Sequence, residues 1–246
     1  MRMWIAPQCI QPGAKAWLST LPHIVATADA SRDIYRGRNH LLRGISPWGE
    51  VVIKSFRVPS ILQALGYTCR RSKALRSLVN GLILQRLGMP TPQPIAAVEE
   101  RDGWRLRRSW YVCALVSDAH TIRGDLDAPN ITASRRISQC GALAGVMHNA
   151  GLLHADFSPG NIIFSMNGDP YLVDINRMRL GRVSACLGAG SIARMYAKGE
   201  SRDIFCAAYA HVRGLRYASV QRRYTAAYRW LHVQRELKNA LRPWRW

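Results

Sequence analysis

The residues best suited to chemistry lie in one polar loop and at the end of the strand expected after it. The loop contains His154, Asp156 and Asn161, and a short apolar run then leads to Asp174. An Asp, an Asn and a second Asp in this order, on loops that flank a short hairpin, suit phosphoryl transfer. Asp156 would orient or deprotonate an acceptor hydroxyl, while Asn161 and Asp174 would hold Mg²⁺ against phosphates.

The same spacing is that of a protein-kinase-type catalytic loop. The pattern H-x-D-x-x-x-x-N runs from His154 to Asn161, and Asp174-Ile175-Asn176 stands where the metal-binding D-F-G is expected. We expect His154 to scaffold this loop rather than to transfer protons. Any one of these residues alone is more typical of a surface turn or a helix cap, so the prediction depends on their order and context.

A nucleotide-binding residue is expected earlier in the chain. Lys54 lies within the apolar, β-rich run 50–56, so its ammonium must reach something polar. That polar partner is either the phosphates of ATP or solvent, which the flexible stem of the side chain can reach. No G-x-G-x-x-G precedes this strand, and only Gly37 stands where a phosphate-covering turn is expected. Arg36 or Arg38 could compensate by charge.

These residues require two lobes to position them. We predict an α+β, two-lobed protein-kinase-like fold with a small antiparallel-sheet lobe, one long helix and a reduced helical lobe. The expected domains are an N-terminal extension over 1–30, the first lobe over 31–116 and the second over 117–246, which ends in a basic, aromatic-rich helix. The elements expected are a sheet over 33–56, a helix over 69–87, a hairpin over 94–116, a helix over 131–149, strands over 161–164 and 171–173, and mostly helix from 177 onward.

Composition limits the class of protein. Of 246 residues 48% are hydrophobic and 20% charged, which excludes a disordered chain or a coiled coil as a whole. The net charge of +20 favours an anionic partner, and residues 177–246 carry 15 basic against 3 acidic side chains. No apolar run approaches the length of a membrane-spanning helix or a secretory signal, so we expect an intracellular, cytoplasmic protein.

The chain resembles the bacterial lipopolysaccharide core kinases, the Kdo and heptose kinase family. Aminoglycoside and choline kinases resemble it only at the H-x-D-x-x-x-x-N loop. The resemblance covers about residues 30–215. The stretches that carry it are Val52–Pro59, Ser72–Ala74, Gly88–Ile95, His154–Asn161 and Val173–Arg179.

The resemblance implies ATP- and Mg²⁺-dependent transfer of phosphate to a sugar hydroxyl of the lipid A–core glycolipid at the inner membrane face. In this assignment Asp156 and His154 are catalytic, while Lys54, with Gly37 and Arg38, binds ATP. Residues 222–246 interleave arginines with tyrosines and tryptophans, so they suit either an anionic membrane surface or ordinary packing on the lobe. No specific nucleic acid is expected as a partner.

Two departures from the kinase pattern keep other functions open. No acidic residue occurs over 55–98, so the helix there offers no glutamate to Lys54. Asp174, the nucleotide or Asn80 must hold Lys54, or the enzyme is impaired. Asn176 also replaces the glycine of D-F-G, which reduces access to positive φ. The alternatives are therefore a catalytically impaired pseudokinase and, from the high positive charge, a RIO-like protein kinase associated with RNA or ribosomes.

Overall fold

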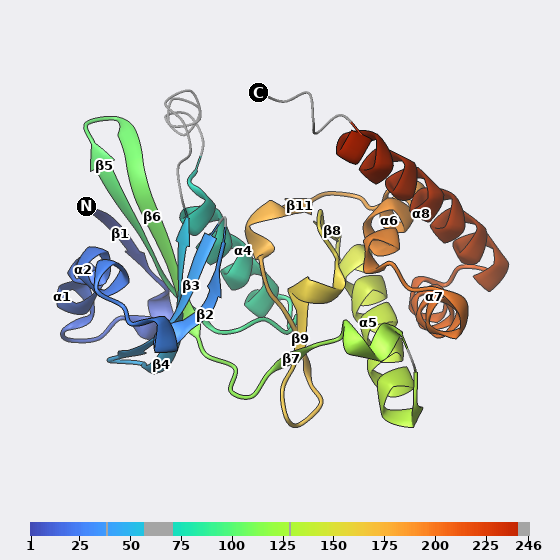
Figure 1. Cartoon of the computed structure of the whole chain (residues 1–246), viewed down its shortest axis with the longest axis horizontal. Coiled ribbons are helices and arrows are strands. Elements are labelled where there is room, and N and C mark those ends of the chain that lie inside the picture. Colours follow the sequence, from blue (N-terminus) through green and yellow to red (C-terminus); the bar gives the residue numbers. More distant parts are fainter. Residues whose placement is uncertain (38, 57–70, 128, 241–246) are drawn as a thin grey trace. The chain divides into compact units, whose positions relative to one another are not determined.

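The computed structural model describes residues 1–37, 39–56, 71–127 and 129–240. This part of the chain forms two compact units, shown in Figure 1. The first contains residues up to Ser117 together with Asp174–Asn176. The second contains Asp118–Val173 and the chain from Arg177 onward. The short segment after the second predicted strand therefore belongs to the first unit, although sequence reasoning assigned it to the second lobe.

Among the described residues, the first unit has a six-stranded antiparallel sheet in the order β1-β5-β6-β4-β3-β2. The expected sheet and hairpin are both part of it, and the segment over 33–56 supplies three strands. Lys54 of β4 lies between Leu41 of β3 and Tyr111 of β6 in the register. The strands are β1 (Arg2–Ile5), β2 (Asp33–Arg36), β3 (Asn39–Ser46), β4 (Gly49–Phe56), β5 (Pro94–Asp102) and β6 (Arg105–Ala114).

The long helix of this unit is α4 (Lys73–Arg86), which packs against β5 and β6. It begins after Ser72, whose side chain accepts the backbone N–H of Leu75 at 3.1 Å. It ends before Gly88, which has φ +66°, a conformation that glycine adopts without strain. The first residues of the predicted helix, 69 and 70, lie outside the described part of the chain.

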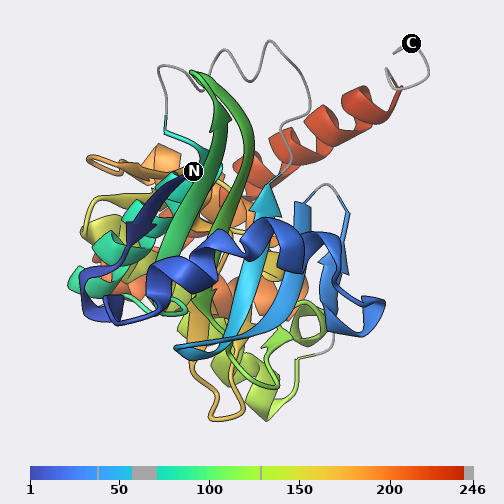
Figure 2. The same cartoon turned by 90° about the vertical axis from the view of Figure 1, so that its left-hand side faces the viewer.

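Residues 1–30 are not a separate extension, contrary to the sequence prediction. β1 pairs with β5 at the edge of the sheet, and α1 (Ala14–Ser19) and α2 (Leu21–Ala26) lie on the sheet face opposite α4 (Figures 1 and 2). Leu18 and Leu21 are fully buried in the same core as Ile53. The error arises because each of these elements is too short to show a period, while its apolar side chains still complete the core.

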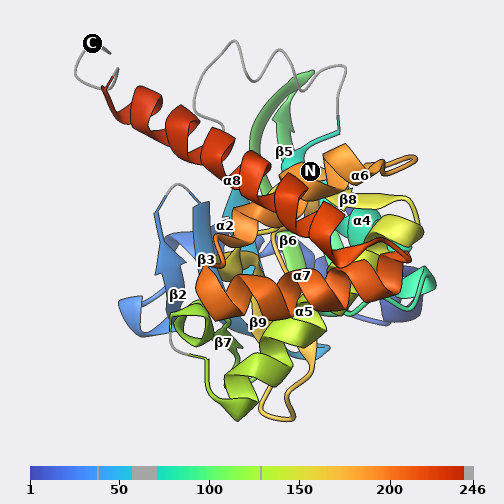
Figure 3. The same ribbon diagram turned by 90° about the vertical axis from the view of Figure 1, so that its right-hand side faces the viewer.

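The second unit is mainly helical. α5 (Ile131–Asn149) packs along α7 (Gly199–Arg213), as Figure 3 shows. The two backbones approach closely at Gly141, where a Cβ atom would lie 2.4 Å from the carbonyl oxygen of Phe205. α6 (Ala185–Ile192) and α8 (Tyr217–Ala240) complete the helices. Where residues are described, no helix is both long and apolar enough to cross a membrane.

Short strands support the loops of this unit. In the described chain they form the sheets β10-β9-β7 and β11-β8. The expected strands appear as β9 and β10, whereas β7, β8 and β11 were not predicted. The strands are β7 (His120–Thr121), β8 (Leu152–His154), β9 (Ile162–Phe164), β10 (Pro170–Leu172) and β11 (Met178–Leu180). The 3₁₀ turns among the described residues of both units are η1 (Pro7–Cys9), η2 (Ala30–Arg32), η3 (Gly124–Leu126), η4 (Pro159–Asn161), η5 (Ile175–Arg177) and η6 (Ala193–Met195).

A buried histidine makes the stability of this unit sensitive to acid. His148 of α5 is 2% exposed, and its Nδ1 lies 2.9 Å from the hydroxyl of Tyr209. Burial, and to a lesser degree the charge of Arg213, lowers the pKa of His148 to about 4. The ordinary histidine pKa is about 6.5. Between these values the unfolded chain binds a proton that the folded chain does not, so acidification favours unfolding.

We therefore expect the free energy of unfolding to fall by about 3 kcal/mol as the pH drops from about 6.5 to 4 because of this one residue. His148→Asn keeps a polar atom near the position of Nδ1 and removes the titrating group. Urea unfolding at a series of pH values should give a flatter profile for the variant. Equal slopes for the two proteins over this range would contradict the assignment.

Candidate active site

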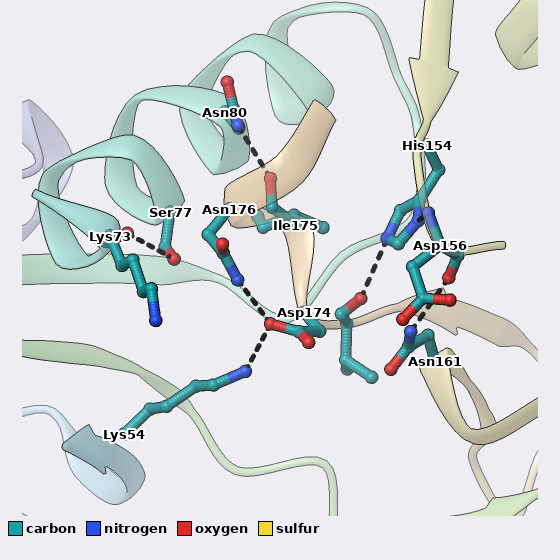
Figure 4. A network of polar contacts seen from close by, with 11 residues as sticks. Lys54, Lys73, Ser77, Asn80, His154, Asp156, Asn161, Asp174, Ile175 and Asn176 are labelled. Atoms are coloured by element: carbon teal, nitrogen blue, oxygen red, sulfur yellow. Dashed lines mark hydrogen bonds and ion pairs between the residues drawn. The ribbon is translucent and has the colours of Figure 1, made fainter. Parts of the chain in front are cut away.

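In the first unit, Lys54 and Asp174 form an ion pair. Lys54 Nζ lies 2.6 Å from Asp174 Oδ1, and the two side chains are 13% and 31% exposed (Figure 4). The ammonium also lies 5.4 Å from the centre of the Phe56 ring. The sequence left three partners open for Lys54, namely Asp174, the nucleotide and Asn80. The structure shows an ion pair with the carboxylate of Asp174.

Asp174 has an unusual backbone conformation. Its φ is +53°, in the left-handed region that residues other than glycine, asparagine and aspartate rarely adopt. The side-chain amide of Asn176 donates a hydrogen bond to Asp174 Oδ1. Positive φ is thus found at Asp174 and not at Asn176. The loss of the D-F-G glycine does not strain this loop, because its third residue does not need that conformation here.

Asn80 of α4 holds this loop by its backbone. Its Nδ2 donates to the carbonyl oxygen of Ile175 at 2.7 Å, and both residues are buried. The next residue, Gly81, allows the close approach, since a Cβ there would lie 3.3 Å from Ile175 Cδ1 and 2.9 Å from Pro94 Cβ. Sequence reasoning considered Asn80 as a partner of Lys54. The structure instead pairs Lys54 with Asp174, while Asn80 anchors the loop that contains Asp174.

In the phosphate-transfer reaction expected from the sequence, we expect Asn80→Leu to lower the rate by about tenfold or more, because the Ile175 carbonyl loses its buried donor and the Asp174 loop loosens. A matched control is Ser77→Ala, on the same helix, which removes the partly buried hydrogen bond from Ser77 Oγ to the Lys73 carbonyl. The control should cost about 1 kcal/mol of stability and leave the rate unchanged. Initial rates at saturating ATP, measured beside thermal unfolding, check this. Equal rates for the two variants would show that Asn80 does not position the loop.

In the second unit, His154 supports the predicted catalytic loop. It is fully buried at the end of β8 and packs edge to face on Phe157. The backbone N–H of Asp156 donates to its Nδ1 at 3.2 Å, so its Nε2 carries the proton and donates to the carbonyl of Val173 at 3.2 Å. Both ring nitrogens bind backbone groups, which is the geometry of a scaffold.

The loop itself is closed by Asn161. Its Nδ2 donates to the carbonyl of Asp156 at 2.8 Å, which leaves its Oδ1 as the available amide oxygen. The backbone N–H of Val173 donates to the Asn161 carbonyl at 3.0 Å. The Asp156 carboxylate makes no hydrogen bond or ion pair with any residue that the structure describes. Val173, which is bonded to this loop, directly precedes Asp174 in the sequence.

The predicted phosphate-covering turn is only partly described. Gly37 lies between β2 and β3, where its N–H donates to the Asn39 carbonyl at 3.1 Å, and Arg38 lies outside the described residues. The sequence suggested that the charge of Arg36 could compensate for the missing glycines. In the structure Arg36 pairs with Asp33, its Nε 3.1 Å from Asp33 Oδ2. The structure places Gly37 at the expected turn and shows no contact from it to Lys54 among the described residues.

Arg123 is a residue that sequence reasoning missed. Its guanidinium lies beside the catalytic loop, with Nη2 3.4 Å from where a Cβ of Gly160 would be. Its side chain is exposed and has no hydrogen bond or ion pair within the described chain. Nothing in the sequence points to it, because it precedes the loop by more than 30 residues and belongs to no motif.

Comparison with known proteins identifies the family. The model of the lipopolysaccharide kinase (Kdo/WaaP) family matches residues 63–185, half of the chain. The chain belongs to this family. The matched region contains Asn80, the catalytic loop and Asp174, whereas Lys54 lies before it. The family resemblance stated from the motifs is thereby confirmed.

Relatives within the lipopolysaccharide kinase family are similar over a limited stretch. A 3-deoxy-D-manno-octulosonic acid kinase of Stenotrophomonas maltophilia is 29% identical over 140 residues, and one of Xanthomonas campestris pv. campestris is 25% identical over 139 residues. In both cases the alignment covers 54% of this chain and 54% of the relative. The chain thus spans about half the length of the curated relatives it matches.

The fold has a solved counterpart. The structure described as WaaP in complex with acyl carrier protein matches 96% of this chain and 98% of its own with a TM-score of 0.62, at 15% sequence identity. At this identity the likeness bears on the fold alone. It confirms the predicted α+β kinase-like fold, with an antiparallel sheet in the N-terminal part and helices in the C-terminal part.

Proposed function

We propose that this chain is an ATP- and Mg²⁺-dependent kinase that phosphorylates a sugar hydroxyl of lipopolysaccharide core, Kdo or heptose, at the inner membrane face. Family membership supports the reaction class, and the names of the two relatives favour Kdo as the acceptor. The observation that carries the proposal is the catalytic loop. His154 and the Asn161 amide nitrogen are used to hold the backbone, so Asp156 and Asn161 Oδ1 remain available for substrate and metal.

The residues present suit magnesium. The oxygen donors are Asn161 Oδ1 and the partly exposed carboxylate of Asp174, and Mg²⁺ prefers one or two such protein ligands beside substrate phosphates. Among the described residues no group of three His, Cys, Asp or Glu side chains forms a metal site of another type. When bound, the ion would neutralise charge on the transferred phosphate.

The protein's own side chains would then divide the remaining work. Asp156 accepts the hydrogen bond of the acceptor hydroxyl and takes its proton as the phosphate is transferred. Lys54 holds Asp174 in place and offers positive charge to the nucleotide phosphates. Arg123, exposed beside Gly160, offers a guanidinium to an acidic group of the acceptor, which suits a sugar acid.

Transfer of labelled γ-phosphate to purified acceptors tests this function. We expect label in a glycolipid whose core ends at Kdo, no label when the metal is chelated, and little label in lipid A without core sugars. Nucleotide binding without transfer to any core acceptor would favour the pseudokinase alternative, and label in protein alone would favour the RIO-like one. The pseudokinase alternative has less support from the structure than from the sequence, because Lys54 does have a carboxylate partner.

A further inference from the structure

The C-terminal helix α8 has an exposed apolar stripe on the side opposite its packed face. Its packed face consists of Val220, Tyr224 and Tyr228: the first two are 3% and 1% exposed, and the third packs edge to face on Tyr196. After Tyr224, no residue of α8 whose burial is described is buried. The second half of the helix therefore extends beyond α6 and α7, as Figures 1 and 3 show.

The stripe follows helical spacing. Its members are Ala226, Trp230, Val233 and Leu237, at i, i+4, i+7 and i+11, and the three large ones are 62%, 46% and 56% exposed. At about 100° per residue these four positions fall within about 60° of one another, and roughly 200° from Tyr224. Large apolar side chains aligned on the unpacked side of a helix indicate a surface that is covered by something else.

Positive charge borders the stripe on both sides. Arg222 and Arg229 lie along one edge and Arg223 along the other, all three exposed. The one acidic residue of α8, Glu236, is paired with His232 at 3.1 Å. A surface with apolar side chains at its centre and guanidinium groups at its edges matches the headgroup region of an anionic bilayer, where tryptophan also partitions.

We propose that α8 binds the surface of an anionic membrane through the stripe Ala226–Trp230–Val233–Leu237, with Arg222, Arg223 and Arg229 contacting lipid phosphates. The helix lies parallel to the bilayer, its apolar stripe at the boundary between headgroups and acyl chains. The long arginine stems reach around the helix, so the charges stay at the level of the phosphates. The proposal goes beyond the transfer reaction and does not require it, although it would bring a kinase to a substrate anchored in a bilayer.

Vesicle flotation of the full chain, without nucleotide or glycolipid, tests this. Wild type should float with vesicles of phosphatidylcholine and phosphatidylglycerol, not with phosphatidylcholine alone, and less at high salt. Combining Trp230→Ser with Leu237→Ser should lower the partition coefficient at least tenfold. So should the combined changes Arg222→Gln, Arg223→Gln and Arg229→Gln.

Two control variants match these changes elsewhere on the molecule. Ile131→Ser with Met166→Ser removes apolar side chains that are 92% and 78% exposed in the same unit, and Arg43→Gln, Arg86→Gln and Arg135→Gln removes the same charge from exposed positions. Both control variants should have partition coefficients within about twofold of the wild-type value. The proposal fails if wild type ignores anionic vesicles, if the stripe variant floats like wild type, or if the stripe variant instead dissolves a dimer that does not bind vesicles. Asp156→Asn should float normally, so loss of the reaction cannot be mistaken for loss of this surface.

Discussion

Asp156→Asn is expected to lower the rate of phosphate transfer by about a thousandfold, with the fold and Mg-ATP binding retained. The replacement has the same shape, and the carboxylate that it removes makes no hydrogen bond or ion pair with the described residues, so stability should not fall. The backbone N–H and carbonyl of Asp156, which bind His154 and Asn161, are unchanged. Steady-state transfer of labelled phosphate, beside thermal unfolding with and without Mg-ATP, measures both effects.

His154→Gln is the matched comparison for this prediction. It disturbs the two backbone hydrogen bonds that the ring makes, so it should cost more stability than Asp156→Asn and lower the rate less. A rate for Asp156→Asn within tenfold of wild type would refute its assignment as the group that accepts the hydroxyl proton. A greater loss for His154→Gln in fully folded protein would reverse the two roles.

Asp174→Asn is expected to lower the rate of metal-dependent phosphate transfer about as much as Asp156→Asn does. It should also weaken the stabilisation of the folded protein by Mg-ATP. Asparagine tolerates the left-handed conformation found at this position and still accepts a hydrogen bond from Lys54, so the loop should keep its shape. What is lost is the negative charge that pairs with Lys54 and that, in the proposed function, would bind the metal ion. A ligand that binds only the folded state raises the unfolding temperature, so a smaller Mg-ATP shift reports the loss independently of the rate.

Asp169→Asn serves as the control for this second prediction. Asp169 is exposed in the turn before β10, and only its backbone takes part in hydrogen bonds. It should transfer phosphate and respond to Mg-ATP like wild type. If Asp174→Asn kept a normal Mg-ATP shift and lost only the rate, Asp174 would act on the reacting groups without holding the metal. A normal rate of phosphate transfer for Asp174→Asn would show that Asp174 is not part of the active site.

The loop from His154 to Asn161 was predictable as one local unit because its residues are close in sequence. The spacing of His154, Asp156 and Asn161 places them within one short segment from the end of β8 to the start of β9, and β10 ends shortly before Asp174. The long periodic helix over 131–149 appears with the bounds that its pattern predicts. Several elements of two to six residues, such as β1, α1 and β7, were missed, because so few residues show no period by themselves.

The sequence by itself determined the family, the order of the polar residues and the excess of positive charge near the C-terminus, because these are properties of neighbours along the chain. Only the tertiary structure decided what holds Lys54, since its carboxylate partner lies 120 residues away in the sequence. It likewise decided that Asn80 binds a loop carbonyl and that Trp230 faces solvent while Tyr224 is buried on the same helix. Such pairings follow from which surfaces are buried together, and long-range packing, rather than local preference, determines that.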